Sequence, residues 1–301
     1  AIDRHVLAGR GDQTAIIYDS AMTGTKKFHT YNDLLERVSL FAGALVNQGV
    51  TKGDRVVIYM PMIPEALYAM LACARIGAIH SVVFGGFAAN ELAVRIDDAT
   101  PKVIVTSSGG FEPGRHVEYL PIIEKALALS NGSVKSVIVH ERAAVPGSVK
   151  DFDEKTDVHW LSWKEAIASA TPQEPVAVLA TDPLYILYTS GTTGKPKGVA
   201  HTHENFILTG QNSSQFDSLN YKDNILAYLP MAWVGDHLFS YAQAMVNGLT
   251  VNCPESKETV MADMREIGPS YYFAPPRIFE GLLTQVTIRM EDAGTIKRKL
   301  F

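Results

Sequence analysis

Cysteine is scarce in this chain, which holds only Cys73 and Cys253 among 301 residues. Two cysteines cannot build a disulfide framework, so the sequence predicts a fold held by its core in a reducing compartment, and we expect a cytoplasmic protein. Long apolar runs are also missing, because Pro61, Pro64 and Glu65 interrupt the longest one. A membrane-spanning helix needs about 18 or more apolar residues, so none is predicted.

An excess of positive charge is absent as well. The chain has 27 Lys and Arg against 32 Asp and Glu, a net charge of −5. This balance excludes a protein whose main partner is nucleic acid. Hydrophobic residues make up 47% and charged residues 20%, which excludes a disordered chain. The composition therefore predicts a globular protein, and its length favours about two domains or subdomains.

Short β-branched runs alternate with helical patterns along the chain. A helical pattern follows Thr30, repeats apolar residues every three or four positions to about Gln48, and ends before Gly49. The other predicted helices cover 64–76 and 89–98, and the predicted strands cover 14–19, 54–60, 78–84, 102–107, 184–188 and 199–202. Such alternation predicts an α/β fold with doubly wound sheets and flanking helices.

The most distinctive segment is TSGTTGKPKG, Thr189–Gly198, between two predicted strands. Its ten residues include three glycines, four hydroxyls and two lysines. Glycines allow successive backbone N–H groups to converge on one anion, and hydroxyl and ammonium groups add donors. The segment matches neither the Walker pattern nor G-x-G-x-x-G. It predicts a phosphate-binding loop, and the alternative is a flexible polar hairpin.

This segment resembles the phosphate-loop signature of the adenylate-forming (AMP-binding) superfamily, which includes the acyl-CoA synthetases. Residues 1–195, with GDRVVIYMPMIPEALYAMLACARIGAIHSVVFGGF within them, resemble acetyl- and propionyl-CoA synthetases. Residues 196–301, with ILAYLPMAWVGDHLFSYAQ and FAPPRIFEGLL, resemble bacterial long-chain acyl-CoA synthetases. A divergent enzyme, a natural recombinant and a constructed chimera all remain open.

The resemblance implies an AMP-forming acid–CoA ligase. ATP activates a small-molecule carboxylic acid, whose chain length stays open, as an acyl-adenylate, and CoA then takes the acyl group; Mg²⁺ accompanies the phosphates. The family's Tyr-Gly-x-Thr-Glu and Tyr-x-x-Gly-Asp motifs do not occur. We therefore expect a fragment, with a first α/β subdomain at 1–180, a truncated phosphate-loop and acyl-site subdomain at 181–301, and no C-terminal catalytic domain. The alternative is a nucleotide- or polyphosphate-binding module without turnover.

The resemblance also implies site residues. The ATP phosphates would be held by Thr189, Ser190, Gly191, Thr192, Thr193, Gly194 and Lys197. The expected catalytic residues are Lys197, Thr193 and His237, although His237 is equally compatible with a satisfied core histidine. The acid would lie at Trp233 and Val234, unless Trp233 is a core aromatic residue.

For CoA, the resemblance implies Gly85, Gly86 and Arg115. Glu112 replaces a second family arginine, and a solvated surface charge is the alternative for Arg115. No side chain of this sequence is expected to bind a metal, since the family's Mg²⁺-binding glutamate lies in the missing adenine motif. The oligomeric state stays open, and self-association through uncovered sheet faces is one alternative.

Overall fold

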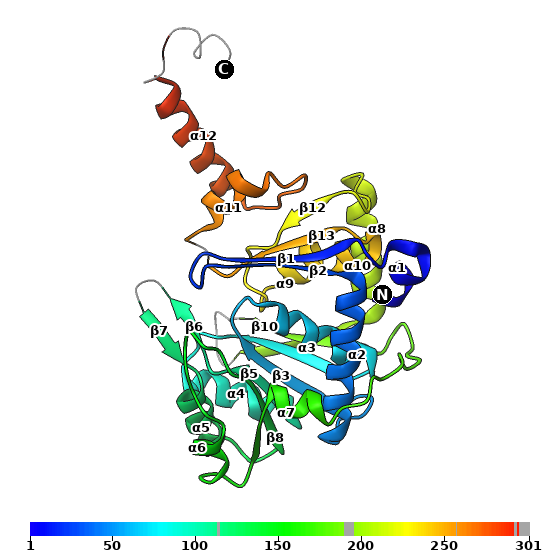
Figure 1. The fold of residues 1–301 in the computed structure, drawn as a ribbon, viewed down its shortest axis with the longest axis vertical. Coiled ribbons are helices and arrows are strands. Elements are labelled where there is room, and N and C mark those ends of the chain that lie inside the picture. The colour runs from blue at the N-terminus through cyan, green and yellow to red at the C-terminus, as the bar shows by residue number, and fades with distance from the viewer. Residues whose placement is uncertain (113–114, 190–195, 257, 292–293, 295–301) are drawn as a thin grey trace.

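The computed structural model describes residues 1–112, 115–189, 196–256, 258–291 and 294 (Figure 1). Within them, seven strands form one large sheet in the order β11 (Lys197–Thr202), β10 (Pro183–Thr189), β4 (Ile79–Phe84), β3 (Arg55–Met60), β5 (Val103–Ser107), β8 (Ser136–His140) and β9 (His159–Ser162). Neighbouring strands are parallel, except that β11 runs antiparallel to β10. The predicted strands are thus confirmed, with boundaries shifted by a residue or two.

Helices cover both faces of this sheet, which confirms the doubly wound class. Along β3, Val56 and Ile58 belong to the core shared with α2 (Tyr31–Asn47) and α3 (Pro64–Arg75). The alternate residues Val57 and Tyr59 belong to a second core. That core is formed with α4 (Ala89–Ala99) and α5 (Leu120–Leu129). Strands buried on both faces explain the continuous apolar runs in the sequence.

Local signals set the boundaries of α2. The Thr30 hydroxyl accepts from the Asp33 N–H at 3.1 Å, and the Asp33 carboxylate accepts from the Thr30 N–H at 2.8 Å. This capping box begins the helix at Tyr31. After the helix, Gly49 adopts φ +77°, a conformation that glycine takes without strain.

A smaller sheet lies above the large one in Figure 1 and has the order β12 (Asn224–Leu226), β13 (Thr250–Pro254), β1 (Thr14–Ser20) and β2 (Thr25–Thr30). β1 pairs in parallel with β13, so it joins segments more than 230 residues apart in the chain. Strand pairings in both sheets connect residues on either side of position 180, and the division into 1–180 and 181–301 stays a prediction.

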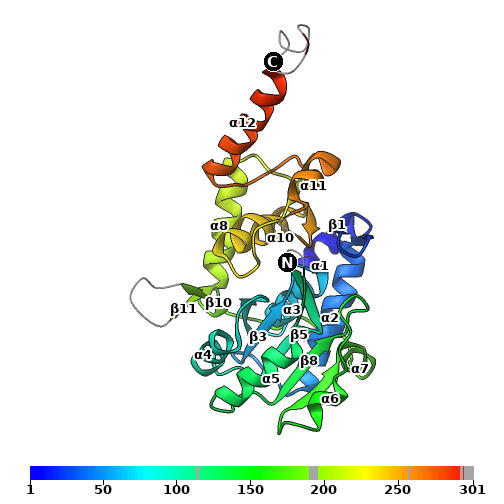
Figure 2. The ribbon, with the colours of Figure 1, turned by 90° about the vertical axis from the view of Figure 1, so that its left-hand side faces the viewer.

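The remaining elements connect and cover these sheets. They are α1 (Ile2–His5), the π-helical turn η1 (Val6–Arg10), the hairpin β6 (Gly109–Glu112) and β7 (Arg115–Glu118), α6 (Lys150–Asp153), α7 (Trp163–Ala168), α8 (His203–Phe216), α9 (Val234–Asp236), the π-helical turn η2 (His237–Ala242), α10 (Gln243–Asn247), α11 (Val260–Ile267) and α12 (Pro276–Glu291). Helix α12 extends away from the body in both ribbon views (Figures 1 and 2). No helix in the described ranges is long and apolar enough to cross a membrane.

A buried ion pair ties the two sheets together. Glu255 follows β13 of the small sheet, and Arg142 follows β8 of the large one. Arg142 Nη2 lies 2.6 Å from Glu255 Oε1, and the two side chains are 7% and 1% exposed. Glu255 Oε2 accepts from the Tyr18 and Ser20 hydroxyls of β1, both at 2.6 Å. The carboxylate therefore has partners from both sheets.

Candidate functional site

The β10–β11 hairpin places the glycine-rich segment at one edge of the large sheet. Tyr185 of β10 is in register with His80 of the parallel strand β4. Both strands end four residues beyond this pair, at Thr189 and Phe84. Thr189, the last residue of β10, and the Gly85–Gly86 turn that follows β4 therefore lie at the carboxyl edge of the sheet. Ligands of open α/β sheets bind outside this edge.

The two strands of the hairpin bring the ends of the predicted phosphate loop together. Thr189 and Lys197 are paired across the hairpin, and both are exposed. The other predicted phosphate-binding residues, Ser190, Gly191, Thr192, Thr193 and Gly194, lie outside the described residues. An exposed ammonium and a hydroxyl at the two ends of a glycine-rich turn fit a polyphosphate ligand, because both can donate hydrogen bonds to its oxygens.

The base of the hairpin is fixed to helix α4. Tyr188 donates its hydroxyl proton to Asp98 Oδ2 at 2.7 Å. The guanidinium of Arg95, which is 6% exposed, lies 5.3 Å from the Tyr188 ring centre and 4.7 Å from that of Phe87. A Cβ on Gly198 would meet Asp98 Oδ2 at 3.1 Å, so β11 also packs closely here. These contacts hold the loop's two ends in a fixed geometry.

Sequence analysis did not predict this anchoring group. Arg95 and Asp98 lie three residues apart on a predicted helix, so they share a face. Nothing local shows that this face meets Tyr188, because the contact depends on β10 lying next to β4.

The predicted CoA residues come together at the same edge. A Cβ on Gly86 would lie 2.6 Å from Glu112 Oε1 and 2.7 Å from Phe84 Cε1, so a larger residue here would have to displace these side chains. Glu112 Oε2 in turn accepts from Arg115 Nη2 at 2.6 Å and from Nε at 3.1 Å. Gly85 packs against the Tyr119 hydroxyl. The glycine turn and Arg115 are thus joined through Glu112, the residue that departs from the family pattern.

The predicted acyl residues lie at the start of α9. Trp233 is 59% exposed and Val234 is 47% exposed. One turn later, His237 is fully buried, with Nδ1 3.3 Å from the Trp233 carbonyl oxygen. Its ring stacks on Tyr185 at 4.5 Å and lies 5.7 Å from the His80 ring. The acyl-site segment therefore packs against β10, the strand that leads into the phosphate loop.

Burial controls the protonation of this segment. It lowers the pKa of His237 to about 4, so the imidazole is neutral near pH 7. It raises the pKa of the adjacent Asp236 carboxyl to about 7. Asp236 is 1% exposed, and its side-chain interaction with Ser240 offsets only part of the effect of burial. Sequence analysis did not single out Asp236 as a titrating group.

The raised pKa of Asp236 predicts a pH-dependent free energy of unfolding. In the unfolded chain an aspartate titrates near about 3.9. Between pH 4 and 7 the unfolded state therefore releases this proton while the folded state keeps it, so rising pH favours unfolding. At pH 8, we expect the free energy of unfolding of Asp236→Asn to exceed that of the parent chain by up to about 4 kcal/mol. At pH 4, we expect it to be no higher than that of the parent chain.

Urea unfolding of both chains at the two pH values measures this difference. His237 contributes in the opposite direction, since its lowered pKa makes stability fall as pH drops from about 6.5 toward 4. That contribution is common to both chains, so it cancels in the comparison. A parent-to-variant difference that is the same at pH 4 and pH 8 would rule out the titration of Asp236.

The predicted absence of a protein-bound metal remains a prediction. His201 stacks on Tyr185 at 4.6 Å, and His203 begins α8. In the described parts of the chain, no group of three or more His, Cys, Asp or Glu side chains is arranged to hold a metal ion.

A doubly wound sheet with a hairpin that flanks a glycine- and lysine-rich segment at its carboxyl edge is typical of α/β proteins that bind nucleotides or phosphates. Comparison with protein families makes this specific, since a model of the AMP-binding enzymes matches residues 3–300. The chain belongs to the AMP-binding enzyme family.

Individual relatives agree with this assignment. The chain is 42% identical to the bovine (Bos taurus) mitochondrial acyl-CoA synthetase short-chain family member 3, over 100% of this chain and 43% of that protein. It is 43% identical to an acetyl-coenzyme A synthetase of Xanthobacter autotrophicus, over 83% of this chain and 38% of the relative. The fold is similar to that of acetoacetyl-CoA synthetase from Streptomyces lividans, with a TM-score of 0.74 and 23% identity over 84% of this chain and 38% of the other. The chain thus spans less than half the length of these relatives.

Proposed function

We propose that this chain is the phosphate-loop part of an AMP-forming acid–CoA ligase, which activates a carboxylic acid with ATP and transfers the acyl group to CoA. The observation that carries the proposal is the TSGTTGKPKG segment at the carboxyl edge of the sheet, next to Gly85–Gly86. Membership in the AMP-binding enzyme family supports it independently.

The chemistry requires stabilisation of negative charge. A carboxylate attacks the α-phosphate of ATP and pyrophosphate leaves, so an anion approaches an anion. Donors fixed before the reaction lower this barrier most effectively. We assign this role to Thr189 and Lys197, with Ser190, Gly191, Thr192, Thr193 and Gly194 between them. The contacts that tie Tyr188 to α4 support it, because they fix the ends of the loop.

The acid would lie at Trp233 and Val234, with His237 as a catalytic residue. The stacking of His237 on Tyr185 supports this placement, since it joins α9 to the phosphate-loop strand. Mg²⁺ would supply positive charge at the ATP phosphates, and we assign no protein ligand to it. The substrate class is a carboxylic acid. The exposed indole of Trp233 and the names of the short-chain and acetyl-CoA relatives favour a short one, whereas the resemblance of residues 196–301 to long-chain enzymes stays a prediction.

The test of this function is exchange of label between pyrophosphate and ATP. We expect exchange in the presence of Mg²⁺ that requires an added carboxylate, with acetate or propionate more effective than octanoate. Exchange independent of the acid would contradict ligase chemistry, and binding of Mg–ATP without any exchange would mean that these 301 residues alone do not activate an acid. The latter result would leave a nucleotide-binding module without turnover.

We also propose that the protein is located in a reducing compartment, specifically the cytoplasm. Cys73 and Cys253 are both buried and free, as expected where disulfides do not form. The name of the bovine relative gives a mitochondrial location for that protein.

The Glu112–Arg115 pair predicts an effect on CoA binding. At the proposed CoA site, the Glu112 carboxylate binds the Arg115 guanidinium and so competes with an anionic ligand for it. We expect Glu112→Gln to bind CoA about two- to fivefold more tightly, since a largely exposed ion pair contributes little. The comparison is a calorimetric titration of both chains with CoA. Glu118→Gln, in the same hairpin, should leave the affinity unchanged. Weaker CoA binding by Glu112→Gln would show that the carboxylate assists the ligand.

A further inference from the structure

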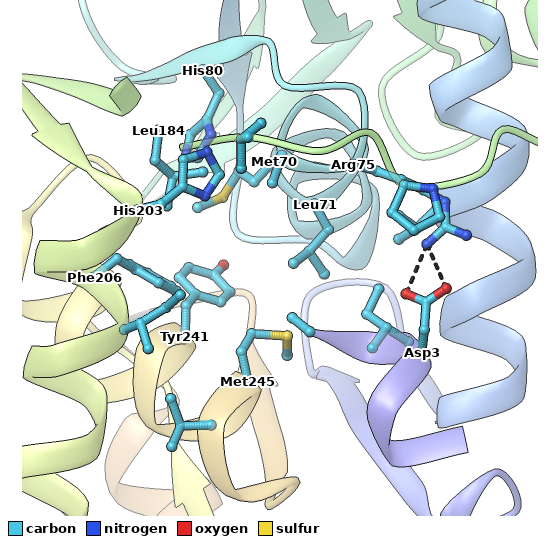
Figure 3. Close-up of a pocket in the computed structure, with 18 of the residues that line it drawn as sticks. Asp3, Met70, Leu71, Arg75, His80, Leu184, His203, Phe206, Tyr241 and Met245 are labelled. Atoms are coloured by element: carbon cyan, nitrogen blue, oxygen red, sulfur yellow. Dashed lines mark hydrogen bonds and ion pairs between the residues drawn. The ribbon is translucent and has the colours of Figure 1, made fainter. Parts of the chain in front are cut away.

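A cavity of about 320 Å³ lies between α1, α3, α8 and the η2–α10 segment. Most of its wall is apolar, formed by side chains that include Leu67, Met70, Leu71, Phe206, Tyr241 and Met245 (Figure 3). It is about twice the volume of an engineered apolar cavity that holds benzene. His237, the proposed catalytic residue, lines one end of this space, whereas the proposed acid-binding residues Trp233 and Val234 do not line it.

One end of the cavity carries histidines without hydrogen-bond partners. His80 is 4% exposed, and neither of its ring nitrogens has a partner among the described residues. The Nε2 atoms of His203 and His237 also lack a partner there. A buried polar group left unpaired costs about 1–3 kcal/mol, so these nitrogens favour an occupant that can hydrogen-bond.

The histidine end carries no positive charge near neutral pH. Burial lowers the pKa of His80, His203 and His237, so their rings are neutral. A neutral imidazole offers one N–H donor and one acceptor nitrogen. This pattern matches a group that both donates and accepts, such as a hydroxyl, and gives no charge compensation to a buried carboxylate.

The opposite end of the cavity carries the Arg75–Asp3 ion pair. Figure 3 shows Arg75 paired with Asp3 on the side of the cavity away from His80 and His203. Arg75 Nη1 lies 3.0 and 2.9 Å from the two Asp3 carboxylate oxygens, and Nε donates to the Gln173 carbonyl oxygen at 2.5 Å. The guanidinium therefore has its counterion, and it does not present a free positive charge to a ligand.

We propose that this cavity is a second binding site, for an uncharged molecule with an apolar body and one hydroxyl group. The body lies among the α3, α8 and α10 side chains, and the hydroxyl hydrogen-bonds to one of the two unpaired ring nitrogens of His80. The volume, the apolar wall, the unpaired imidazole nitrogens and the closed Arg75–Asp3 pair support this class. Arg4 and the Ala1 amino group also line the cavity and are the groups that an acid would use, so the octanoate arm of the test below decides between the two classes. A medium-chain alcohol has these properties, so this site differs in ligand from the proposed acid-binding segment at Trp233.

The test uses 1-octanol and octanoate as probes at pH 8, with binding followed by the melting temperature and by calorimetry. A ligand that binds the native state raises the melting temperature by mass action. We expect 1-octanol to bind, octanoate at the same concentration to bind at least tenfold more weakly, and His80→Leu to weaken 1-octanol binding about 2- to 12-fold.

Two variants that fill the cavity, Leu71→Phe and Ala74→Trp, should each abolish 1-octanol binding while retaining a cooperative melt; either one suffices if the other does not fold. Octanoate binding as tightly as 1-octanol would overturn the proposal and make the cavity an acid site. No binding of 1-octanol, or binding unaffected by the filling variants, would also overturn it. Neither result bears on the phosphate loop, which the pyrophosphate exchange assay tests separately.

Discussion

Replacing Lys197 by alanine should weaken the binding of Mg–pyrophosphate by about 10- to 150-fold. The Lys197 ammonium is exposed at the start of β11, opposite Thr189. A hydrogen bond to a charged group contributes about 1.5–3 kcal/mol, which corresponds to this range of affinity. Calorimetric titration of both chains with Mg–pyrophosphate gives the ratio. The structure predicts little change in stability, because the side chain is not buried.

Lys135→Ala is the matched control for this variant. Lys135 is also exposed, but it lies before β8, at the opposite end of the parallel strands from the hairpin. Its loss removes the same net charge without removing a proposed ligand group. Equal weakening by both variants would mean that pyrophosphate responds only to the net charge of the protein, and Lys197 would lose its assigned role.

Replacing Glu255 by leucine should destabilise the chain by about 3–5 kcal/mol. This change leaves the buried guanidinium of Arg142 without its counterion, and such a loss has a cost of this size. The Tyr18 and Ser20 hydroxyls lose their acceptor as well. Because the group joins the two sheets, the loss should lower the urea midpoint of the entire cooperative transition.

The double variant Arg142→Met/Glu255→Leu separates the ion pair from simple packing. Removing both charges should restore much of the stability lost in Glu255→Leu, since no unpaired charge remains buried. Glu266→Gln serves as an exposed control, because Glu266 pairs with Lys26 at the surface and should change stability by less than about 1 kcal/mol. A double variant less stable than Glu255→Leu would show that the pair stabilises the protein beyond charge compensation.

The parts of the fold that could be predicted are those with local signals. Thr30 and Asp33 form the capping box that begins α2, and Gly49 ends it, as the spacing indicated. Strands β3, β4 and β5 were readable as β-branched runs because both of their faces are buried. The phosphate loop was predicted from its glycines, hydroxyls and lysines together with the family resemblance, and it stays a prediction because residues 190–195 lie outside the described part of the chain.

Long-range pairing carried no comparable signal. Nothing in residues 14–20 indicates that β1 pairs with β13. For the same reason, the tie between Asp98 and Tyr188 and the stack of His237 on Tyr185 could not be predicted. Each depends on which strands are neighbours, and strand order is set by the packing of the assembled sheets rather than by any one segment.

The ion pair of Arg115 shows a different limit. The family resemblance indicated that Arg115 matches a family arginine and that Glu112 replaces a second one. Only the structure shows that the new carboxylate lies against Gly86 and binds the guanidinium. A substitution can therefore be read from the sequence, while its effect on a neighbouring charge depends on geometry.

The most direct test of phosphate binding at the hairpin is a calorimetric competition among Mg–pyrophosphate, Mg–ATP and AMP. The account predicts that pyrophosphate and ATP compete for one site, and that Lys197→Ala weakens both. It predicts weaker binding for AMP, which has no β- or γ-phosphate. If AMP binds as tightly as ATP, or if pyrophosphate and ATP bind without competing, the glycine-rich segment is not the site that holds the terminal phosphates.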